Sequence, residues 1–433
     1  MRKKYLVLNN FCSFNRMSFL PNQPKGIAGG KDILGYVGAN IFYKLSFYLL
    51  IIWMAKFLGK IELGKYFFLI SLPGIFLPFS ELGINTLLTR EIARNQADME
   101  EIVSTVLGFR LMLILILYAG IGIISLLFHP DILPLLLLSS LFLSLESLYF
   151  TFGAIFIAFQ RIKYNIFCGV LSRVCLILSV YMVLKSGGRL FHVFLSHLSV
   201  ALILLGTGWW LGRKIVPIKF RKPPRQVFIN LFRNSLPFAI IAYIPLIYYR
   251  IDSVMLTLFH GFKETGIYGA GFKIREASLL LPQSIMIVLF PFISASYKEK
   301  PLLNKTFKNI TKSLLPFSLF LSLSVIFFGD QLVSFIYGRE FLDVAKILKL
   351  LFSTLPFVFF NSVLLSFLKG TGNETKCAVL LLFLLGLKLF LNYLLIPPLA
   401  SLGVVTSTLA IDLALFTLLF YHWERWEKRS GHP

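Results

Sequence analysis

The chain has 433 residues, of which 57% are hydrophobic and 15% are charged, and its formal net charge is +23. Soluble domains carry about 25% charged residues, so this composition argues against a soluble enzyme. A basic chain can bind nucleic acid by neutralising phosphates. Here, however, the runs 111–128, 132–145 and 378–396 are almost uncharged, and about 20 apolar residues cross a bilayer as a helix. The composition therefore predicts a membrane protein that does not bind nucleic acid.

The first 32 residues precede the first long apolar run. The segment MRKKYLVLNN is basic, but its apolar stretch is too short for the hydrophobic core of a signal peptide. We therefore expect a cytoplasmic leader at 1–32, followed by an uncleaved first span.

Hydropathy predicts an all-α fold with about twelve transmembrane helices in two sets of six. The predicted spans of the first set are 33–57, 65–88, 102–128, 132–159, 164–185 and 190–212. Those of the second set are 231–259, 266–296, 310–329, 344–368, 374–396 and 400–422. Strands are excluded because only helices or closed barrels satisfy every backbone amide in lipid, and these solid apolar blocks lack the alternation of barrel strands.

Short clusters of turn-forming residues separate several of these spans. They are His129-Pro130-Asp131, Ser186-Gly187-Gly188, Gly370-Thr371-Gly372-Asn373 and Pro397-Pro398. We expect the chain to leave its helix at each of them.

Lys and Arg are distributed unevenly between the two sides of the membrane. If both termini are cytoplasmic, 27 of the 43 fall on the leader, the even-numbered connections and the tail, and only 8 fall on the outer connections. Cytoplasmic loops of membrane proteins carry such an excess of Lys and Arg. The sequence thus predicts a multi-pass protein of the cytoplasmic (inner) membrane with both termini inside.

The most basic connection follows the sixth span and divides the chain into two lobes. We expect a first six-helix lobe at 33–212, a basic cytoplasmic linker at 213–230, a second six-helix lobe at 231–422 and a cytoplasmic tail at 423–433. The linker's Lys and Arg side chains are suited to anionic lipid headgroups.

The two lobes contain a short repeat. Residues 59–66 read GKIELGKY and residues 261–268 read GFKETGIY, so both contain G-x-x-E-x-G-x-Y at an offset of 202 residues. Both copies lie between the first and second span of their lobe. We therefore predict parallel repeats, related by an axis along the membrane normal, as many transporters have.

Charged residues also fall within the predicted spans, where a charge is costly and usually faces a polar cavity or a partner. The basic ones are Lys44, Arg110, Arg173, Arg250, Lys273, Arg275, Lys349 and Lys388, and the acidic ones are Glu81, Glu146, Asp252, Glu276 and Asp412. The excess of cations favours a cavity that receives an anion. Ion pairing between helices and snorkelling at span ends are the alternative, above all for Lys44, Lys349 and Arg275.

Arg250 and Asp252 lie two residues apart on one predicted helix, so they face different partners. Lys273 and Glu276 lie three apart and can pair on one face. The expected cavity cations are Arg250, Lys273, Arg110 and Arg173, and the expected charge-balancing or ion-coupling residues are Asp252, Glu276 and Glu81. We find no catalytic constellation and no metal-ligand spacing, so no cofactor is expected.

Several segments carry a resemblance to a known family. YYRIDSVML (248–256), ETGIYGAGFKI (264–274) and LFPFIS (289–294) resemble polysaccharide-biosynthesis flippases, which transport lipid-linked oligosaccharides such as O-antigen units. These belong to the multidrug/oligosaccharidyl-lipid/polysaccharide exporter superfamily. Three further stretches agree: LGKIELGKYFF (58–68), ELGINTLLTREIAR (81–94) and NYLLIPPLASLGVVTSTLA (392–410), where Val405 and Ser407 depart from the usual small residue and Ala.

The resemblance implies a V-shaped pair of six-helix bundles that rock between inward-open and outward-open states. It implies that the substrate is an oligosaccharide on polyprenyl diphosphate, moved by a monomer from the inner to the outer leaflet, with a proton or a monovalent cation as coupling ion. A diphosphate also suits the intramembrane Arg and Lys residues, since Arg forms bidentate contacts with phosphate oxygens. The apolar tail would stay in membrane lipid at a gap between the lobes.

Two other functions are considered. A multidrug or small-cation antiporter of the same superfamily would need an acidic cavity, which the excess of cations opposes. A membrane glycosyltransferase, polymerase or ligase would need a sizeable catalytic loop. The longest outer connection, 329–343, carries no evident acid/base pair.

Overall fold

The computed structural model describes residues 30–85, 88–89, 99–128, 130–217, 225–297 and 299–428. Within these ranges the regular structure is entirely helical, as lipid requires of a chain that cannot leave backbone amides unsatisfied. Most of the predicted leader, the middle of the predicted linker and the end of the predicted tail lie outside the described residues.

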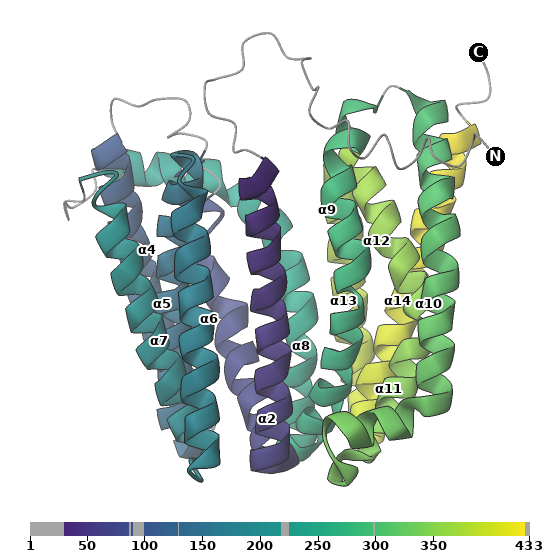
Figure 1. Ribbon diagram of the computed structural model, residues 1–433, viewed down its shortest axis with the longest axis horizontal. Coiled ribbons are helices and arrows are strands. Elements are labelled where there is room, and N and C mark those ends of the chain that lie inside the picture. The colour runs from purple at the N-terminus through teal and green to yellow at the C-terminus, as the bar shows by residue number, and fades with distance from the viewer. Residues whose placement is uncertain are drawn as a thin grey trace.

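The first half of the chain forms one bundle, drawn in purple to teal in Figure 1. Its helices are α2 (Gly30–Phe76), η1 (Leu77–Ser80), α4 (Met99–Phe128), η2 (Pro130–Ile132), α5 (Leu133–Ala158), α6 (Ile162–Lys185) and α7 (Leu190–Gly212). Turns at Pro130 and at Gly187, which has a φ of 79°, connect them where the turn-forming clusters predicted.

The second half forms a second bundle beside the first (Figure 1). Its helices are α8 (Arg225–Ser278), α9 (Leu280–Ala295), α10 (Lys300–Ile336), η3 (Arg339–Phe341), α11 (Asp343–Ser353), α12 (Leu355–Gly370), α13 (Glu374–Leu399) and α14 (Ser401–Lys428). The bundles meet mainly through α2 and α8, which share the most extensive contact of any two helices described.

Nine helical stretches of the described chain are long and apolar enough to cross a membrane, and the count is ten if α11 and α12, bent by 48°, form one span. A straight helix of 47 residues, the length of α2, would measure about 70 Å, more than twice the hydrocarbon thickness of a bilayer. The still longer α8 exceeds it too. Each of these two helices therefore supplies two crossings, and the fold agrees with the prediction of about twelve.

Both long helices break at the predicted repeat. Gly59 in α2 has φ 76° and ψ −178°, and Gly261 in α8 has φ 77° and ψ −172°. These nearly identical angles lie in a region that L-residues with a Cβ rarely adopt. The two motifs, 202 residues apart, thus contain the same backbone turn, one in each bundle.

The repeat also forms the contact between the bundles. A Cβ added at Gly64 would overlap the carbonyl oxygen of Phe262, and one added at Gly266 would overlap the carbonyl oxygen of Lys60. The offset of 202 relates Gly64 to Gly266 and Lys60 to Phe262, so each contact is the counterpart of the other. This reciprocity is what a parallel, pseudo-symmetric pair of repeats produces.

Two boundaries differ from the sequence prediction. Helix α8 begins at Arg225 rather than near 231, so it includes the end of the predicted linker. Helix α13 continues through Pro397 and Pro398 and ends at Leu399, where Ala400 takes a φ of 52°. Proline has a helical φ and lacks only the amide donor. His260 of α8 contacts the carbonyl oxygens of Ile396 and Pro397 at 2.8 and 3.1 Å, which helps satisfy this helix end.

The bundles are joined by an ion pair at the end of the molecule that holds Gly59 and Gly261. Lys60 Nζ of the first bundle lies 2.7 Å from Asp343 Oδ2 of the second. This end corresponds to the predicted outer side and lies at the bottom of Figure 1. The ion pair and the two glycine contacts together close the gap between the bundles there.

Candidate functional site

Arg250 reaches from the second bundle into the first. Its Nη1 donates a hydrogen bond of 2.7 Å to the backbone oxygen of Ile70 in α2. The guanidinium lies against Gly74, where an added Cβ would overlap it. Arg250 therefore faces the first bundle, in a space left open because position 74 has no side chain.

Lys44 crosses the same interface in the opposite direction. It lies on the first half of α2, is exposed, and its Nζ donates to Gln283 Oε1 of α9 at 3.2 Å. Its partner is thus a neutral amide on the other bundle. The sequence left open whether Lys44 is a paired, structural cation, and in the structure no described carboxylate pairs with it.

Lys273 and Glu276 form the predicted pair on α8. Lys273 Nζ lies 2.6 Å from Glu276 Oε2 and 5.1 Å from the centre of the Phe47 ring on α2. This cation lies at the interface between the bundles, and its charge is balanced by its neighbour on the same helix.

Arg110 lies inside the first bundle. Its side chain is fully buried (0% exposed). Its Nη2 donates to Ser147 Oγ at 2.6 Å, and its Nη1 donates to Thr151 and, at 3.3 Å, to Asn85 Oδ1. The structure therefore places Arg110 where it contributes to the local field but does not reach a cavity surface.

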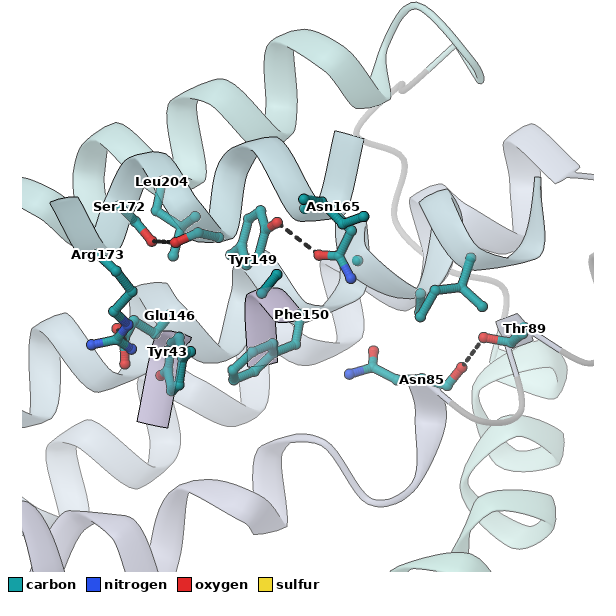
Figure 2. A pocket seen from close by; sticks show the side chains of 16 residues that line it. Tyr43, Asn85, Thr89, Glu146, Tyr149, Phe150, Asn165, Ser172, Arg173 and Leu204 are labelled. Atoms are coloured by element: carbon teal, nitrogen blue, oxygen red, sulfur yellow. Dashed lines mark hydrogen bonds and ion pairs between the residues drawn. The ribbon is translucent and has the colours of Figure 1, made fainter. Parts of the chain in front are cut away.

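Arg173 borders a cavity of about 420 Å³ in the first bundle, shown in Figure 2. It is 3.4 Å from Glu146 Oε1 and stacks on Tyr43, with its guanidinium carbon 3.4 Å from the ring centre. The other polar groups of the wall come from Asn85, Thr89, Tyr149, Asn165 and Ser172. The rest of the wall is apolar and includes Ile157, Ile166 and Leu204, so the amides, the hydroxyls and one ion pair are set in a mainly apolar cavity.

Glu81 follows η1 at the end of the second crossing. One of its oxygens accepts a hydrogen bond of 2.9 Å from Asn85 Nδ2. No cation of the described chain lies within ion-pair distance of it, so Glu81 differs from the other intramembrane carboxylates.

Asp252 lies deep in the second bundle, in a cluster that sequence spacing did not reveal. Its Oδ2 is 2.8 Å from Lys388 Nζ of α13. Asn392 Nδ2 donates to Asp252 Oδ1 at 2.9 Å, and Tyr268 donates to its Oδ2 at 2.7 Å. As the spacing predicted, Asp252 and Arg250 face different partners.

A second buried pair joins Arg275 of α8 to Asp412 of α14. Thr354 also donates to Asp412, at 3.1 Å. Asp412 borders a larger cavity of about 640 Å³, which is lined mostly by apolar residues of α8, α9, α12, α13 and α14. The carboxylate at this cavity is therefore neutralised by a guanidinium.

The pairing accounts for most intramembrane charges. Five cations have a carboxylate partner: Arg173–Glu146, Lys273–Glu276, Arg275–Asp412, Lys388–Asp252 and Lys349–Asp330. Arg275 and Lys349 are thus structural cations, as the alternative interpretation held. Of the eight cations within the predicted spans, all of them described, Lys44, Arg110 and Arg250 have no such partner among the described carboxylates. Two of these three lie at the interface between the bundles.

The sequence could not identify several residues of this region. Gly74 makes room for Arg250, and Asn85, Tyr149 and Asn165 line the cavity of the first bundle. None of them carries a local motif. Their roles depend on which helix faces come together, and a single sequence does not determine that.

Two family models and the sequence of one archaeal protein match this chain. The sequence model of a family described as polysaccharide biosynthesis protein matches residues 30–297, and that of the MatE family matches residues 237–394. An uncharacterized membrane protein of Methanocaldococcus jannaschii is 23% identical over 401 residues, which is 83% of this chain and 77% of that protein.

Two solved structures share the fold. The lipid II flippase MurJ in an inward closed conformation superposes with a TM-score of 0.73 at 16% identity, over 90% of this chain and 87% of that one. An inward-facing multidrug resistance MATE family transporter of the MOP superfamily has a TM-score of 0.68 at 15% identity, over 90% and 96% of the two chains. The predicted superfamily resemblance is thus confirmed.

Proposed function

The chain belongs to the polysaccharide biosynthesis protein family, and from that premise we propose that it is a flippase for an anionic, lipid-linked oligosaccharide. The substrate we favour is an oligosaccharide on polyprenyl diphosphate, moved from the inner to the outer leaflet. The observation that carries this proposal is the placement of Lys44 and Arg250. Both lie between the bundles, and each is bound only to a neutral group of the opposite bundle.

Because the partners of Lys44 and Arg250 are neutral, either cation can replace its protein partner with a substrate phosphate at a low free-energy cost. Breaking a buried ion pair leaves an uncompensated charge, which costs about 3–5 kcal/mol. Arg250 gives up only a hydrogen bond to a backbone oxygen when the bundles separate, about 1.5–3 kcal/mol for a bond to a charged group. A phosphate oxygen would replace it with a stronger, charge-assisted contact.

The remaining parts of such a substrate also match described surfaces. The cavity of Figure 2 offers amide, hydroxyl and aromatic groups, which suit sugar hydroxyls and ring faces. The apolar tail would remain in membrane lipid beside the bundles. Alternating access is supported by the closed outer end, where Lys60, Asp343 and the two glycine contacts meet.

The orientation is part of the proposal. We propose that both termini and the linker at 213–230 are cytoplasmic, from the uneven distribution of Lys and Arg. Reporter fusions after Gly188 and after His260 should report the outer side. A fusion after Pro224 that reports an external position would contradict this orientation.

A coupling ion would need a membrane carboxylate that is free to change its charge. Asp252 and Glu276 are already neutralised by Lys388 and Lys273. Glu81 accepts a hydrogen bond from a neutral amide. We therefore favour Glu81 as the carboxylate that exchanges a proton during transport, and Glu81→Gln should abolish the dependence of transport on a proton gradient. If Glu81→Gln transport still follows the imposed gradient, this role is wrong.

The structure offers less support for the alternatives. A cationic drug needs an unpaired carboxylate in its cavity, whereas Glu146 and Asp412 each pair with a guanidinium. A glycosyltransferase needs a catalytic loop, whereas the connection at 329–343 is mostly the end of α10 and the short helix η3. These observations favour transport of an anion over the two alternatives.

Reconstituted protein can test the proposal directly. A fluorescent polyprenyl-diphosphate-linked sugar in proteoliposomes becomes accessible to an added quencher as it crosses the bilayer. Arg250→Ala should abolish protein-dependent crossing, while Arg250→Lys should restore part of it, because an ammonium loses the bidentate geometry. Arg339→Ala, which removes the same side chain from the exposed outer turn, is the matched control. Normal crossing by Arg250→Ala would refute the role of Arg250.

A further inference from the structure

Lys388 is the most deeply buried charge of the second bundle among the residues whose burial the structure describes. Its side chain is 0% exposed and that of its partner Asp252 is 1% exposed. A charge sealed in a membrane core is costly and usually has a function. The proposed translocation uses neither residue for substrate contact, so their role requires a separate explanation.

The ammonium of Lys388, on α13, contacts three groups of two other helices, α8 and α14. Besides Asp252 of α8, it contacts Thr408 Oγ1 of α14 at 3.2 Å. The ring of Tyr248 lies beneath it, with its centre 4.0 Å from Nζ. A carboxylate oxygen, a hydroxyl oxygen and an aromatic face are the groups that bind a small monovalent cation.

The surrounding hydrogen bonds fix these groups in place. Asn392 donates to the second oxygen of Asp252, and Ser407 donates in turn to the side-chain oxygen of Asn392. Lys388 and Asn392 are one turn apart, so both face Asp252 from the same side of α13. One carboxylate gives the cluster a single negative charge, which one monovalent cation neutralises.

We propose that this cluster is a monovalent-cation site that the chain fills with its own ammonium, that of Lys388. The second bundle then holds the charge of a bound cation permanently, and Na⁺ or K⁺ does not occupy the site. The inference is independent of the proposed substrate, because it concerns only groups inside the second bundle.

Removal of the ammonium should convert the cluster into a site for a free cation. Lys388→Ala leaves Asp252 and Thr408 facing a space once filled by the lysine chain. We expect its thermal midpoint in detergent to be lower than that of the unmodified protein in N-methylglucamine chloride. At equal ionic strength, NaCl or methylammonium chloride should restore it in a saturable manner, since a ligand that binds only the folded state stabilises it. The unmodified protein should melt alike in all three salts.

Matched variants separate a cation site from general salt effects. Lys388→Met removes the charge but fills the space, so it should gain no selective rescue. Lys349→Ala breaks another lysine–aspartate pair, Lys349–Asp330, and should respond equally to every salt. Equal melting of Lys388→Ala in the three salts, or rescue of Lys388→Met as well, would overturn the proposal.

A second measurement does not depend on the stability of Lys388→Ala. Purified unmodified protein and the neutral double variant Asp252→Asn with Lys388→Met should show the same binding of radioactive sodium. A saturable sodium signal in the unmodified protein that disappears in the double variant would mean that Asp252 binds a free cation beside Lys388. That result would also overturn the proposal.

Discussion

At the scale of single residues, the position of Arg250 depends on a residue that has no side chain. The guanidinium occupies the space in which a Cβ of Gly74 would lie, and it bonds to the oxygen of Ile70 one turn earlier. The end of an arginine side chain moves easily, so a larger residue at 74 would displace it rather than distort the backbone. A substitution at position 74 should therefore change transport without unfolding the protein.

Gly74→Ala should impair transport while leaving the protein folded. The loss of the bond from Arg250 costs about 1.5–3 kcal/mol, and alanine in a helix recovers about 1 kcal/mol, so the thermal midpoint should fall only slightly. Crossing of the fluorescent lipid-linked sugar should fall to the level of Arg250→Lys or below. The control is Gly38→Ala on the same helix, where no atom lies within 4 Å of the added Cβ. Unimpaired transport by Gly74→Ala would show that the position of the guanidinium does not matter.

The pairing of these residues was predictable only within a helix. Lys273 and Glu276 are three apart, and helical geometry alone brings them together. Asp252 and Lys388, by contrast, lie on different helices. Arg110 points into the first bundle because its guanidinium donates hydrogen bonds to Ser147 and Thr151 of α5. Contacts of this second kind depend on helix rotation and packing, which hydropathy does not determine.

At the scale of helices, the glycine motif repeated in α2 and α8 makes the contact between the bundles. Gly59 and Gly261 supply the turns, and Gly64 and Gly266 allow the two backbones to touch. The sequence predicted this equivalence because both halves retain the motif. It did not predict that the two copies face each other. It also placed a helix end at Pro397-Pro398, whereas α13 continues to Leu399, because proline removes an amide donor but does not by itself end a helix.

Gly64→Leu should open the outer end. The added side chain would meet the carbonyl oxygen of Phe262, which is backbone and cannot swing away as a flexible side chain does. We expect spin labels at Lys56 and Lys263, one on each bundle, to lie farther apart than in the parent. Gly266→Leu should have the same effect because its contact is the counterpart. Gly206→Leu, placed in open space, should leave the distance unchanged. Unchanged distances in both interface variants would mean that this contact does not hold the outer end closed.

At the scale of the whole molecule, the two bundles are held together by few polar contacts across their interface. Lys60–Asp343 lies at the outer end, whereas Lys44–Gln283 and Arg250–Ile70 lie nearer the middle. Only the first of these is an ion pair. The bundle count and the parallel repeat followed from the sequence, whereas the position of the closed end required the packing of α2, α8 and α11.

If transport requires the bundles to rock, a covalent link at the outer end should stop it. We expect a protein with cysteines at Lys60 and Asp343, on a background without other cysteines, to lose crossing of the fluorescent lipid-linked sugar when a short, reducible cross-linker joins them. Reduction should restore it, because the link and not the substitutions blocks the movement. Each single-cysteine variant treated alike should keep its activity, since Lys60–Asp343 is partly exposed and contributes little to stability.

The matched control is a link within one bundle. Asp330 and Lys349 form a similar lysine–aspartate pair, but both belong to the second bundle. Cysteines at these positions, joined by the same reagent, should leave transport unaffected, because rigid-body rocking does not change distances inside a bundle. Loss of transport with both links would indicate that the reagent damages the protein. Normal transport with the link between Lys60 and Asp343 intact would exclude a mechanism in which the outer end must open, and the substrate would then have to pass along a route that leaves this contact closed.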